Sequence, residues 1–187
     1  IGTEHNQVGS WVNLGHPRLT PPELVNAEYG KLVDPAIHEM QELVVKFRAD
    51  DLKAYTTDSE LSIKSSLVFT GEPHLVIFPE TDFSAPEQAD YIFSGSRHGV
   101  ERRDSFGSWL VDHIGAYMNN HMRHIFPAGI NVNFARRLAS GVIENRCFER
   151  GINRETLACG TGALAVAYVY SQMHHLNISE IDVLPHR

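Results

Sequence analysis

Residues 146–170, RCFERGINRETLACGTGALAVAYVY, decide how this chain folds. Apolar and polar residues alternate up to Gly151, which is typical of a strand, and a polar loop over residues 152–156 follows. The tetrapeptide CGTG at residues 159–162 then opens onto residues 163–173, a run of helix formers that is apolar on nearly every side. A helix that is apolar all round has to be buried, so the pattern predicts that this helix is the axis of the core.

The physical case for chemistry in this stretch rests on Cys159. The first turn of a helix leaves backbone N–H groups without partners and carries a partial positive charge. A thiol there is stabilised as the thiolate, which lowers its pKa from about 8.5. Gly160 and Gly162 would let an anionic ligand approach the same N–H groups closely. The residues alone leave two interpretations open: a reactive thiolate beside a carboxylate or phosphate cradle, or a buried cysteine before a glycine-rich turn.

Length and composition indicate one compact unit. The chain has 187 residues, 42% of them hydrophobic, which is enough to bury a core as a single domain. Its formal net charge of −7 argues against nucleic acid and anionic membranes as partners. No apolar run has the length of a membrane span, and two cysteines, Cys147 and Cys159, do not make a disulfide framework. A reducing cytoplasm is therefore the expected location.

The rest of the chain predicts short strands and one amphipathic helix. Strands are predicted at residues 8–14, 41–48, 61–70, 75–78, 130–138, 142–148 and 181–184. Apolar residues at helical spacing predict a helix over residues 108–121, and the polar stretch 79–107 predicts an insertion or mobile loop. The predicted fold is α+β, with a curved, mostly antiparallel sheet wrapped around the central apolar helix.

Four motifs follow one another along the chain: WVNLGHP at residues 11–17, GEPHLVIF at 71–78, FPAGINVNF at 126–134, and ERG with ETLACGTG at 149–151 and 155–162. Together they resemble the diaminopimelate epimerase family, which belongs to the cofactor-independent amino-acid racemases. The resemblance implies an isomerase that interconverts LL- and meso-diaminopimelate, in lysine and peptidoglycan-precursor biosynthesis. It implies that two cysteines act as base and acid, without pyridoxal phosphate, metal or any other cofactor.

The same resemblance implies a domain organisation and partners. Residues 1–187 correspond to one domain, the C-terminal half of a two-domain enzyme, with the N-terminal half and the last strands absent. The partners are then a small-molecule amino-acid substrate and the N-terminal half of the same enzyme; a homodimer is a further option. The other catalytic cysteine would lie in a Cys-Gly-Asn motif that this chain lacks, so the chain alone is expected to be inactive.

Catalytic roles carry over to three residues. Cys159 corresponds to the catalytic cysteine of the second half, His74 to the histidine that sets a catalytic thiol's protonation, and Glu149 to a carboxylate near the reacting centre. Cys147 lies at a strand position where the family has no catalytic thiol. Histidines near the predicted helix ends are interpreted as solvated, so no metal is expected.

Substrate-binding roles carry over to Asn131, Arg150, Gly160, Thr161 and Glu72. Glu72 departs from the family, in which an asparagine commonly contacts the distal carboxylate of the substrate. A carboxylate at this position would repel that group unless an arginine compensates. Three alternatives stay open: a racemase of another amino acid, a thiol hydrolase with Cys159 as nucleophile and His74 as base, and a non-catalytic binding domain.

Overall fold

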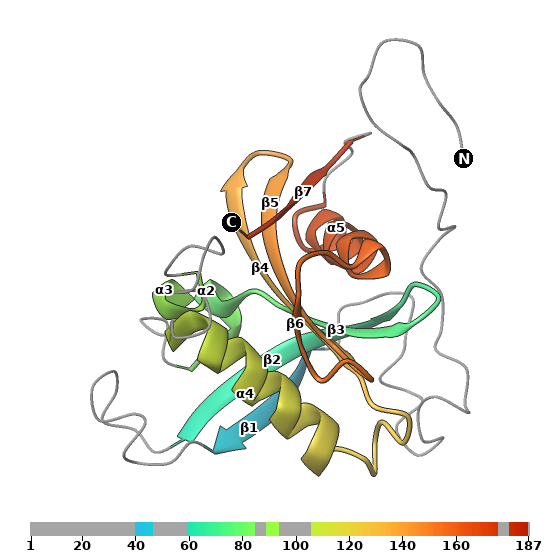
Figure 1. Ribbon diagram of the computed structural model, residues 1–187. Coiled ribbons are helices and arrows are strands. Elements are labelled where there is room, and N and C mark those ends of the chain that lie inside the picture. The colour runs from blue at the N-terminus through green and yellow to red at the C-terminus, as the bar shows by residue number, and fades with distance from the viewer. Residues whose placement is uncertain (1–39, 47–59, 85–88, 94–105, 176–179, 187) are drawn as a thin grey trace.

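The computed structural model of the chain describes residues 40–46, 60–84, 89–93, 106–175 and 180–186 (Figure 1). The strands are β1 (Met40–Lys46), β2 (Glu60–Phe69), β3 (Pro73–Ile77), β4 (Asn131–Ala139), β5 (Val142–Glu149), β6 (Arg154–Thr156) and β7 (Asp182–Pro185). The helices are α2 (Pro79–Asp82), α3 (Ala89–Ile92), α4 (Phe106–His121) and α5 (Gly160–Met173). The predicted α+β class is confirmed. The strand predicted at residues 8–14 and the motif at residues 11–17 lie outside the described residues.

The described strands form one sheet in the order β1-β2-β3-β4-β5-β6, with β7 also beside β5. The pairs β1–β2, β2–β3, β4–β5 and β5–β6 are antiparallel, whereas β3–β4 and β5–β7 are parallel. The sheet is therefore mixed, with antiparallel pairs in the majority. β6 pairs with residues 147–149 of β5 and β7 with residues 142–145, so these two short strands meet β5 at its two ends.

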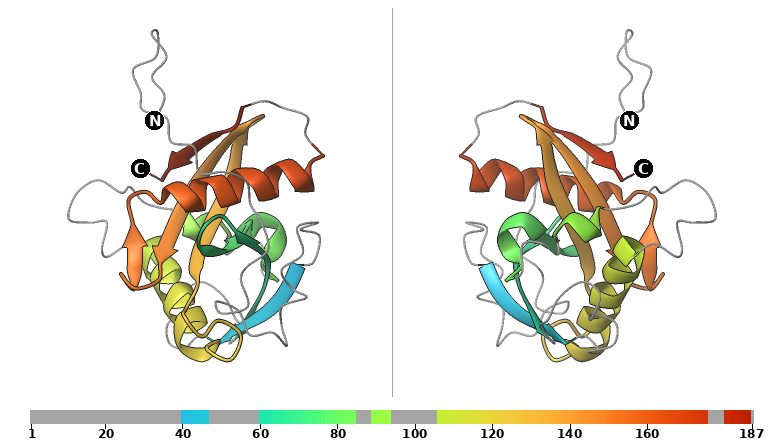
Figure 2. Two further views of the ribbon diagram at one scale, coloured as in Figure 1. Left: turned by 90° about the vertical axis from the view of Figure 1, so that its right-hand side faces the viewer. Right: turned by 90° about the vertical axis from the view of Figure 1, so that its left-hand side faces the viewer.

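Helices α4 and α5 pack against opposite faces of this sheet (Figure 2). Side chains of a strand point alternately to its two faces. Leu75 and Ile77 of β3 accordingly join the hydrophobic core under α4, while Val76 between them joins the core under α5. β5 divides in the same way, with Phe148 in the α4 core and Ile143 in the α5 core.

Helix α5 is buried along one side. Its buried residues are Gly162, Ala165, Val166, Val169 and Tyr170. Its other apolar residues, Leu164 among them, are half-buried. The sequence predicts a helix that is covered all round; within the described residues the sheet covers one side of it. Neither α4 nor α5, with 16 and 14 residues, is long enough to cross a membrane.

The predictions of two loops are wrong in part. The stretch 79–107 contains the short helices α2 and α3, and the stretch 152–156 contains strand β6. Buried apolar residues anchor the first stretch, because Phe83, Ile92 and Phe93 all belong to the α4 core. The second stretch is fixed by Glu155, whose backbone N–H donates to Asp112 Oδ1 at 2.7 Å. Both anchors are tertiary contacts that a local pattern does not reveal.

Candidate active site

Cys159 is the N-cap residue of α5, and the helix begins at Gly160 as the sequence predicts. The backbone of Cys159 is extended, and its Sγ accepts a hydrogen bond from the N–H of Gly162 at 3.4 Å. Gly162 is required there by close packing, since a Cβ at this position would lie 2.5 Å from Asn133 Oδ1. The cysteine thiol therefore takes the place that a serine or aspartate oxygen occupies in an ordinary cap.

A chain of hydrogen bonds runs behind the thiol. Asn133 Nδ2 can only donate, so His74 Nδ1 accepts its hydrogen bond at 2.9 Å and the histidine proton lies on Nε2. His74 Nε2 then donates to Thr161 Oγ1 at 3.1 Å, which leaves the threonine hydroxyl to donate to Cys159 Sγ at 3.4 Å. The direction of donation toward the sulfur favours the thiolate.

His74 is fully buried, and this sets its charge state. Burial lowers the pKa of His74 to about 3, with a smaller contribution from the nearby Arg150 charge. The ring is therefore neutral at physiological pH and acts on Cys159 through Thr161. A thiol hydrolase would need the imidazole as a base in direct contact with the thiol, and the structure places the threonine hydroxyl between them.

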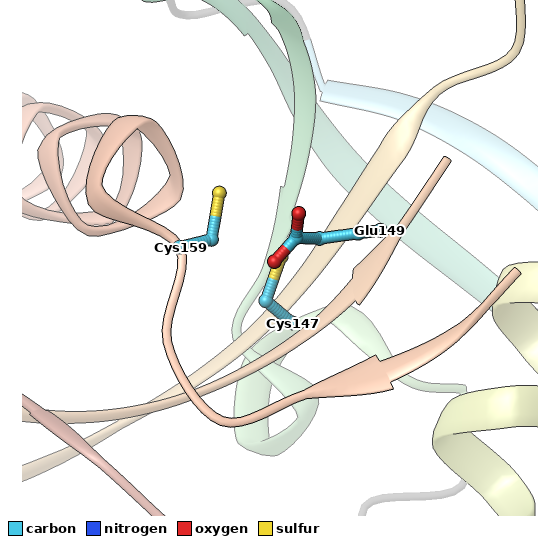
Figure 3. Close-up of side chains that lie close together, drawn as sticks. All are labelled: Cys147, Glu149 and Cys159. Atoms are coloured by element: carbon cyan, nitrogen blue, oxygen red, sulfur yellow. The ribbon is translucent and has the colours of Figure 1, made fainter. Parts of the chain in front are cut away.

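Cys147 and Glu149 approach Cys159 from strand β5 (Figure 3). The two sulfurs and a carboxylate oxygen of Glu149 all lie within 4.8 Å of one another. The hydrogen bond from the Cys147 thiol is the largest of the effects that lower the pKa of Cys159 to about 6; Thr161 and the Gly162 N–H act in the same direction. The pKa of Cys147 is raised well above its ordinary value by this hydrogen bond and by burial. Cys159 is thus a thiolate beside a neutral thiol.

Glu149 is held by Thr156, whose hydroxyl donates to Glu149 Oε1. Strand β6 makes this contact possible, because its pairing with β5 places Thr156 directly opposite Cys147. The carboxylate is half-buried and is oriented toward the thiols. The site therefore has a carboxylate in a fixed position beside the Cys159 sulfur.

The predicted substrate-binding residues form a second group. Arg150 pairs with Glu72 through Nη2, and its Nη1 donates to the carbonyl of Ala128 at 3.2 Å. The arginine thus compensates the Glu72 carboxylate, which is one of the two options that the sequence leaves open. Asn131 Oδ1 accepts from the backbone N–H of Arg150 at 3.0 Å and so fixes the turn that carries the arginine.

A cavity of about 110 Å³ opens beside the thiols. Its lining includes both cysteine side chains, Gly160 and Asn145. Asn145 is 7% exposed, and its Oδ1 has no hydrogen-bond partner among the described residues. A buried acceptor without a partner costs free energy. Such an atom is typical of a place where a ligand or a water donates the missing hydrogen bond.

The structure brings together Cys159, His74, Glu149, Gly160 and Thr161, and it places the Arg150 pair at the end of the neighbouring strands. The residues of the candidate site that sequence reasoning missed are Asn133, Cys147 and Thr156. The signal for Cys147 was present: residues two apart on a strand share a face, so Cys147 and Glu149 point the same way. The positions of Asn133 and Thr156 depend on strand pairing, which no local pattern gives.

The fold and the site define an α+β unit with a thiolate at the N-terminus of helix α5. Curated proteins named diaminopimelate epimerase are similar to this chain. It is 33% identical over 121 residues to the one of Chlorobaculum tepidum, an alignment that covers 61% of this chain and 47% of that protein. It is 42% identical over 76 residues to the one of Buchnera aphidicola subsp. Baizongia pistaciae, which covers 41% of this chain and 26% of that protein.

A third relative is the diaminopimelate epimerase of Chlamydia trachomatis serovar L2, which is 35% identical over 91 residues, or 49% of this chain and 33% of that protein. The chain thus spans about half or less of the length of the curated relatives it matches. No family model matches the chain. The resemblance to diaminopimelate epimerases is shown over part of the chain, and the activity of a whole enzyme is a separate question.

Proposed function

We propose that this chain is the C-terminal half of a cofactor-independent diaminopimelate epimerase, in which Cys159 is one of two acid/base thiols. The observation that carries the proposal is the state of Cys159: its pKa of about 6 makes it a thiolate at neutral pH, at the start of a helix whose Gly162 N–H donates to its sulfur. A base that is charged near neutral pH is what removal of an α-proton requires.

The helix start supplies the second requirement, stabilisation of the negative charge that develops on the substrate carboxylate. The N–H of Gly162 is bonded to Cys159 Sγ and that of Ala163 to the Cys159 carbonyl. The first-turn donors left for a substrate carboxylate are therefore the N–H groups of Gly160 and Thr161. Donors that are fixed before the reaction stabilise developing charge without reorganisation, which is the larger part of many rate enhancements.

The ion pair of Arg150 and Glu72 suits the far end of diaminopimelate. That end is an amino acid with an ammonium and a carboxylate, so it is a zwitterion. Arg150 would attract its carboxylate and Glu72 its ammonium. The departure at Glu72 thereby becomes compatible with the proposed substrate, since the pair presents both charges to one doubly charged group.

A first half would complete the site. It would supply the second thiol on the opposite side of the α-carbon and would cover the half-buried side of α5, which would then be the axis of a sheet wrapped around it. Water excluded from the closed site could no longer screen the helix N-terminus. We also infer a reducing, cytoplasmic setting, because a catalytic thiolate has to stay reduced.

The test is deuterium exchange at the α-carbon. The chain, alone and joined to the first half of the Chlorobaculum tepidum relative, is incubated with one diaminopimelate stereoisomer in deuterated water. We expect deuterium uptake with inversion from the joined protein and none from the chain alone. Cys159→Ala should abolish both, whereas the exposed control Arg137→Ala should leave both intact. Uptake and inversion that persist in Cys159→Ala would overturn the proposal.

A further inference from the structure

The Cys147 thiol is neither the acid nor the base of the chemistry proposed above, yet it is buried and its sulfur lies within 4.8 Å of the Cys159 sulfur. We propose that Cys147, Glu149 and Cys159 form a binding site for a thiophilic divalent cation such as Zn²⁺, held by Sγ of each cysteine and one carboxylate oxygen. This site does not depend on the proposed epimerase function, because it needs only the three donors and no substrate.

The chemistry of the donor set selects the metal. Two thiolates are soft ligands that favour Zn²⁺ and similar cations over Mg²⁺ and Ca²⁺, which prefer oxygen. Binding would release the proton of the neutral Cys147 thiol to solvent, so that both sulfurs coordinate as thiolates. A carboxylate oxygen is an accepted third ligand of Zn²⁺. Three protein ligands leave the fourth tetrahedral position open, and here that position can be reached from the cavity that both cysteines line.

Distances decide between a metal and a disulfide as the natural state of the thiol pair. Zn–S bonds of about 2.3 Å in a tetrahedron place two sulfurs about 3.8 Å apart. The three donor atoms already lie within 4.8 Å of one another, so side-chain shifts of about 1 Å or less would suffice. A disulfide requires about 2.05 Å between the sulfurs and makes no use of Glu149. The arrangement of all three donors therefore fits a cation better.

The surroundings hold the ligands as a metal site requires. Thr156 donates to Glu149 Oε1, which orients the carboxylate. The Gly162 N–H and the Thr161 hydroxyl both donate to Cys159 Sγ, at 3.4 Å each. Cys147 is fixed by its position in the middle of the sheet, between β4 and β6. Outer partners of this kind fix ligand orientation and commonly change metal affinity about 10–100-fold when they are removed.

Asn145 is an independent sign of a ligand in this place. Its Oδ1 is buried and has no hydrogen-bond partner among the described residues, and the residue lines the same cavity. Asn145, Cys147 and Glu149 alternate along β5, so all three share one face. A water in the open fourth position of the cation would be a donor for this oxygen. Metal occupancy would at the same time block the Cys159 thiolate and inhibit any chemistry that uses it as a base.

The test is a titration of the reduced 187-residue chain with Co²⁺, a spectroscopic stand-in for Zn²⁺, followed by Zn²⁺ displacement. We expect thiolate-to-cobalt charge-transfer absorption with the intensity of two thiolates, and displacement by Zn²⁺ or Cd²⁺ but not by excess Mg²⁺. Cys147→Val should weaken Zn²⁺ binding by about 100-fold or more, since it removes a ligand and not only an outer partner. Glu149→Gln should weaken it too, whereas the exposed control Glu180→Gln should not.

Circular dichroism of each variant shows whether it is folded. If Cys147→Val does not fold, Cys147→Ser is used in its place. Zn²⁺ affinity that is the same in wild type and in a folded Cys147 variant would overturn the proposal, as would a cobalt spectrum with a single thiolate. The spectra are recorded without substrate. A failed epimerase assay therefore leaves the metal proposal standing, and failed spectra leave the epimerase proposal standing.

Discussion

Strand β5 carries buried polar residues on both of its faces, and the two faces differ in how completely those residues are hydrogen-bonded. On the face toward α4, the Arg146 side chain is fully buried and bonded to Glu155 through two nitrogens, at 2.9 and 2.7 Å. It also donates to Ser108 Oγ and to the carbonyl of Ile92. On the face toward α5, Asn145 has a buried oxygen without a partner among the described residues, and Cys147 lies beside a thiolate.

The difference separates a cluster that is saturated with hydrogen bonds from the cluster that forms the candidate site. A buried charge with most of its donors bonded holds the chain in place and has little capacity left for a ligand. Here the Arg146–Glu155 pair ties the segment that carries β6 to the core, and so it positions Thr156 and the start of α5. Buried polar atoms with spare bonding capacity, only one residue away along the same strand, are instead available to a substrate or a cation.

Arg146→Met should produce the largest effect, which is measured as a loss of stability. The variant removes the positive charge that Arg146 places against the buried Glu155 carboxylate, which should lower the free energy of unfolding by about 3–5 kcal/mol. Urea unfolding followed by circular dichroism measures it. Arg136→Met is the matched control on the neighbouring strand. The Arg136 side chain is 33% exposed, so its loss should cost about 1 kcal/mol or less.

The double variant Arg146→Met, Glu155→Leu tests the cause. It removes both charges and should recover most of the lost stability, because the penalty comes from burying the Glu155 charge without the opposite charge of Arg146. A double variant as unstable as Arg146→Met would show that the contacts to Ser108 and Ile92, and not the charge balance, stabilise this face.

Gly115→Ala in α4 and Gly162→Ala in α5 test whether packing on the two faces of the sheet affects stability and the candidate site separately. A Cβ at Gly115 would lie 2.1 Å from the ring of Phe148, a rigid neighbour in the α4 core. We expect a loss of about 1–3 kcal/mol in the free energy of unfolding from this overpacking. A Cβ at Gly162 meets the Asn133 amide oxygen instead, and displacing that amide should disturb the bond to His74. Gly162→Ala should therefore lower the rate of Cys159 alkylation more than Gly115→Ala does. Equal effects on this rate would contradict the assignment of different roles to the α4 and α5 faces.

Much of the fold and part of the site could be predicted from the sequence. The strands at β2, β3, β4 and β5 and the helices α4 and α5 follow from local periodicity, and the start of α5 follows from the CGTG tetrapeptide. These elements are fixed by neighbouring residues, which a pattern contains. The placement of Cys159 at the N-cap is predictable for the same reason.

The rest depends on contacts between distant residues. Strand β6 exists because of its pairing with β5 and the bonds of Glu155, and helices α2 and α3 adjoin a core that the local sequence does not show. The pairing of Glu72 with Arg150 links residues 78 positions apart. The nearness of Cys147 to Cys159 needs both the strand face and the path of the loop between them, and only the first can be read from alternation.

Cys147→Ala should raise the pKa of Cys159 from about 6, because the hydrogen bond from the Cys147 thiol is the largest effect that lowers it. The midpoint of the pH profile of iodoacetamide alkylation should move upward, and at pH 7 the rate should fall roughly two- to tenfold as the thiolate fraction drops. Cys147→Ser keeps a donor and should retain most of the low midpoint. If both variants keep the wild-type profile, the thiolate owes its stability to the helix start alone.

Thr161→Val should give the smallest effect, through the relay that links His74 to Cys159. The variant keeps the shape of the side chain and removes the hydroxyl that donates to the sulfur at 3.4 Å and accepts from the histidine at 3.1 Å. Loss of one hydrogen bond to a charged sulfur, in a half-exposed position, should cost the thiolate about 1 kcal/mol, or about threefold in alkylation rate near pH 6. Thr161→Ser, which keeps the hydroxyl, should stay within about twofold of the wild-type alkylation rate.

His74 would lose its hydrogen-bond acceptor in the valine variant as well, and a neutral buried imidazole with an unsatisfied Nε2 proton should also lower stability by about 1 kcal/mol. A valine variant with wild-type alkylation and lowered stability would show that the relay supports the fold of this face and does not set the charge of Cys159.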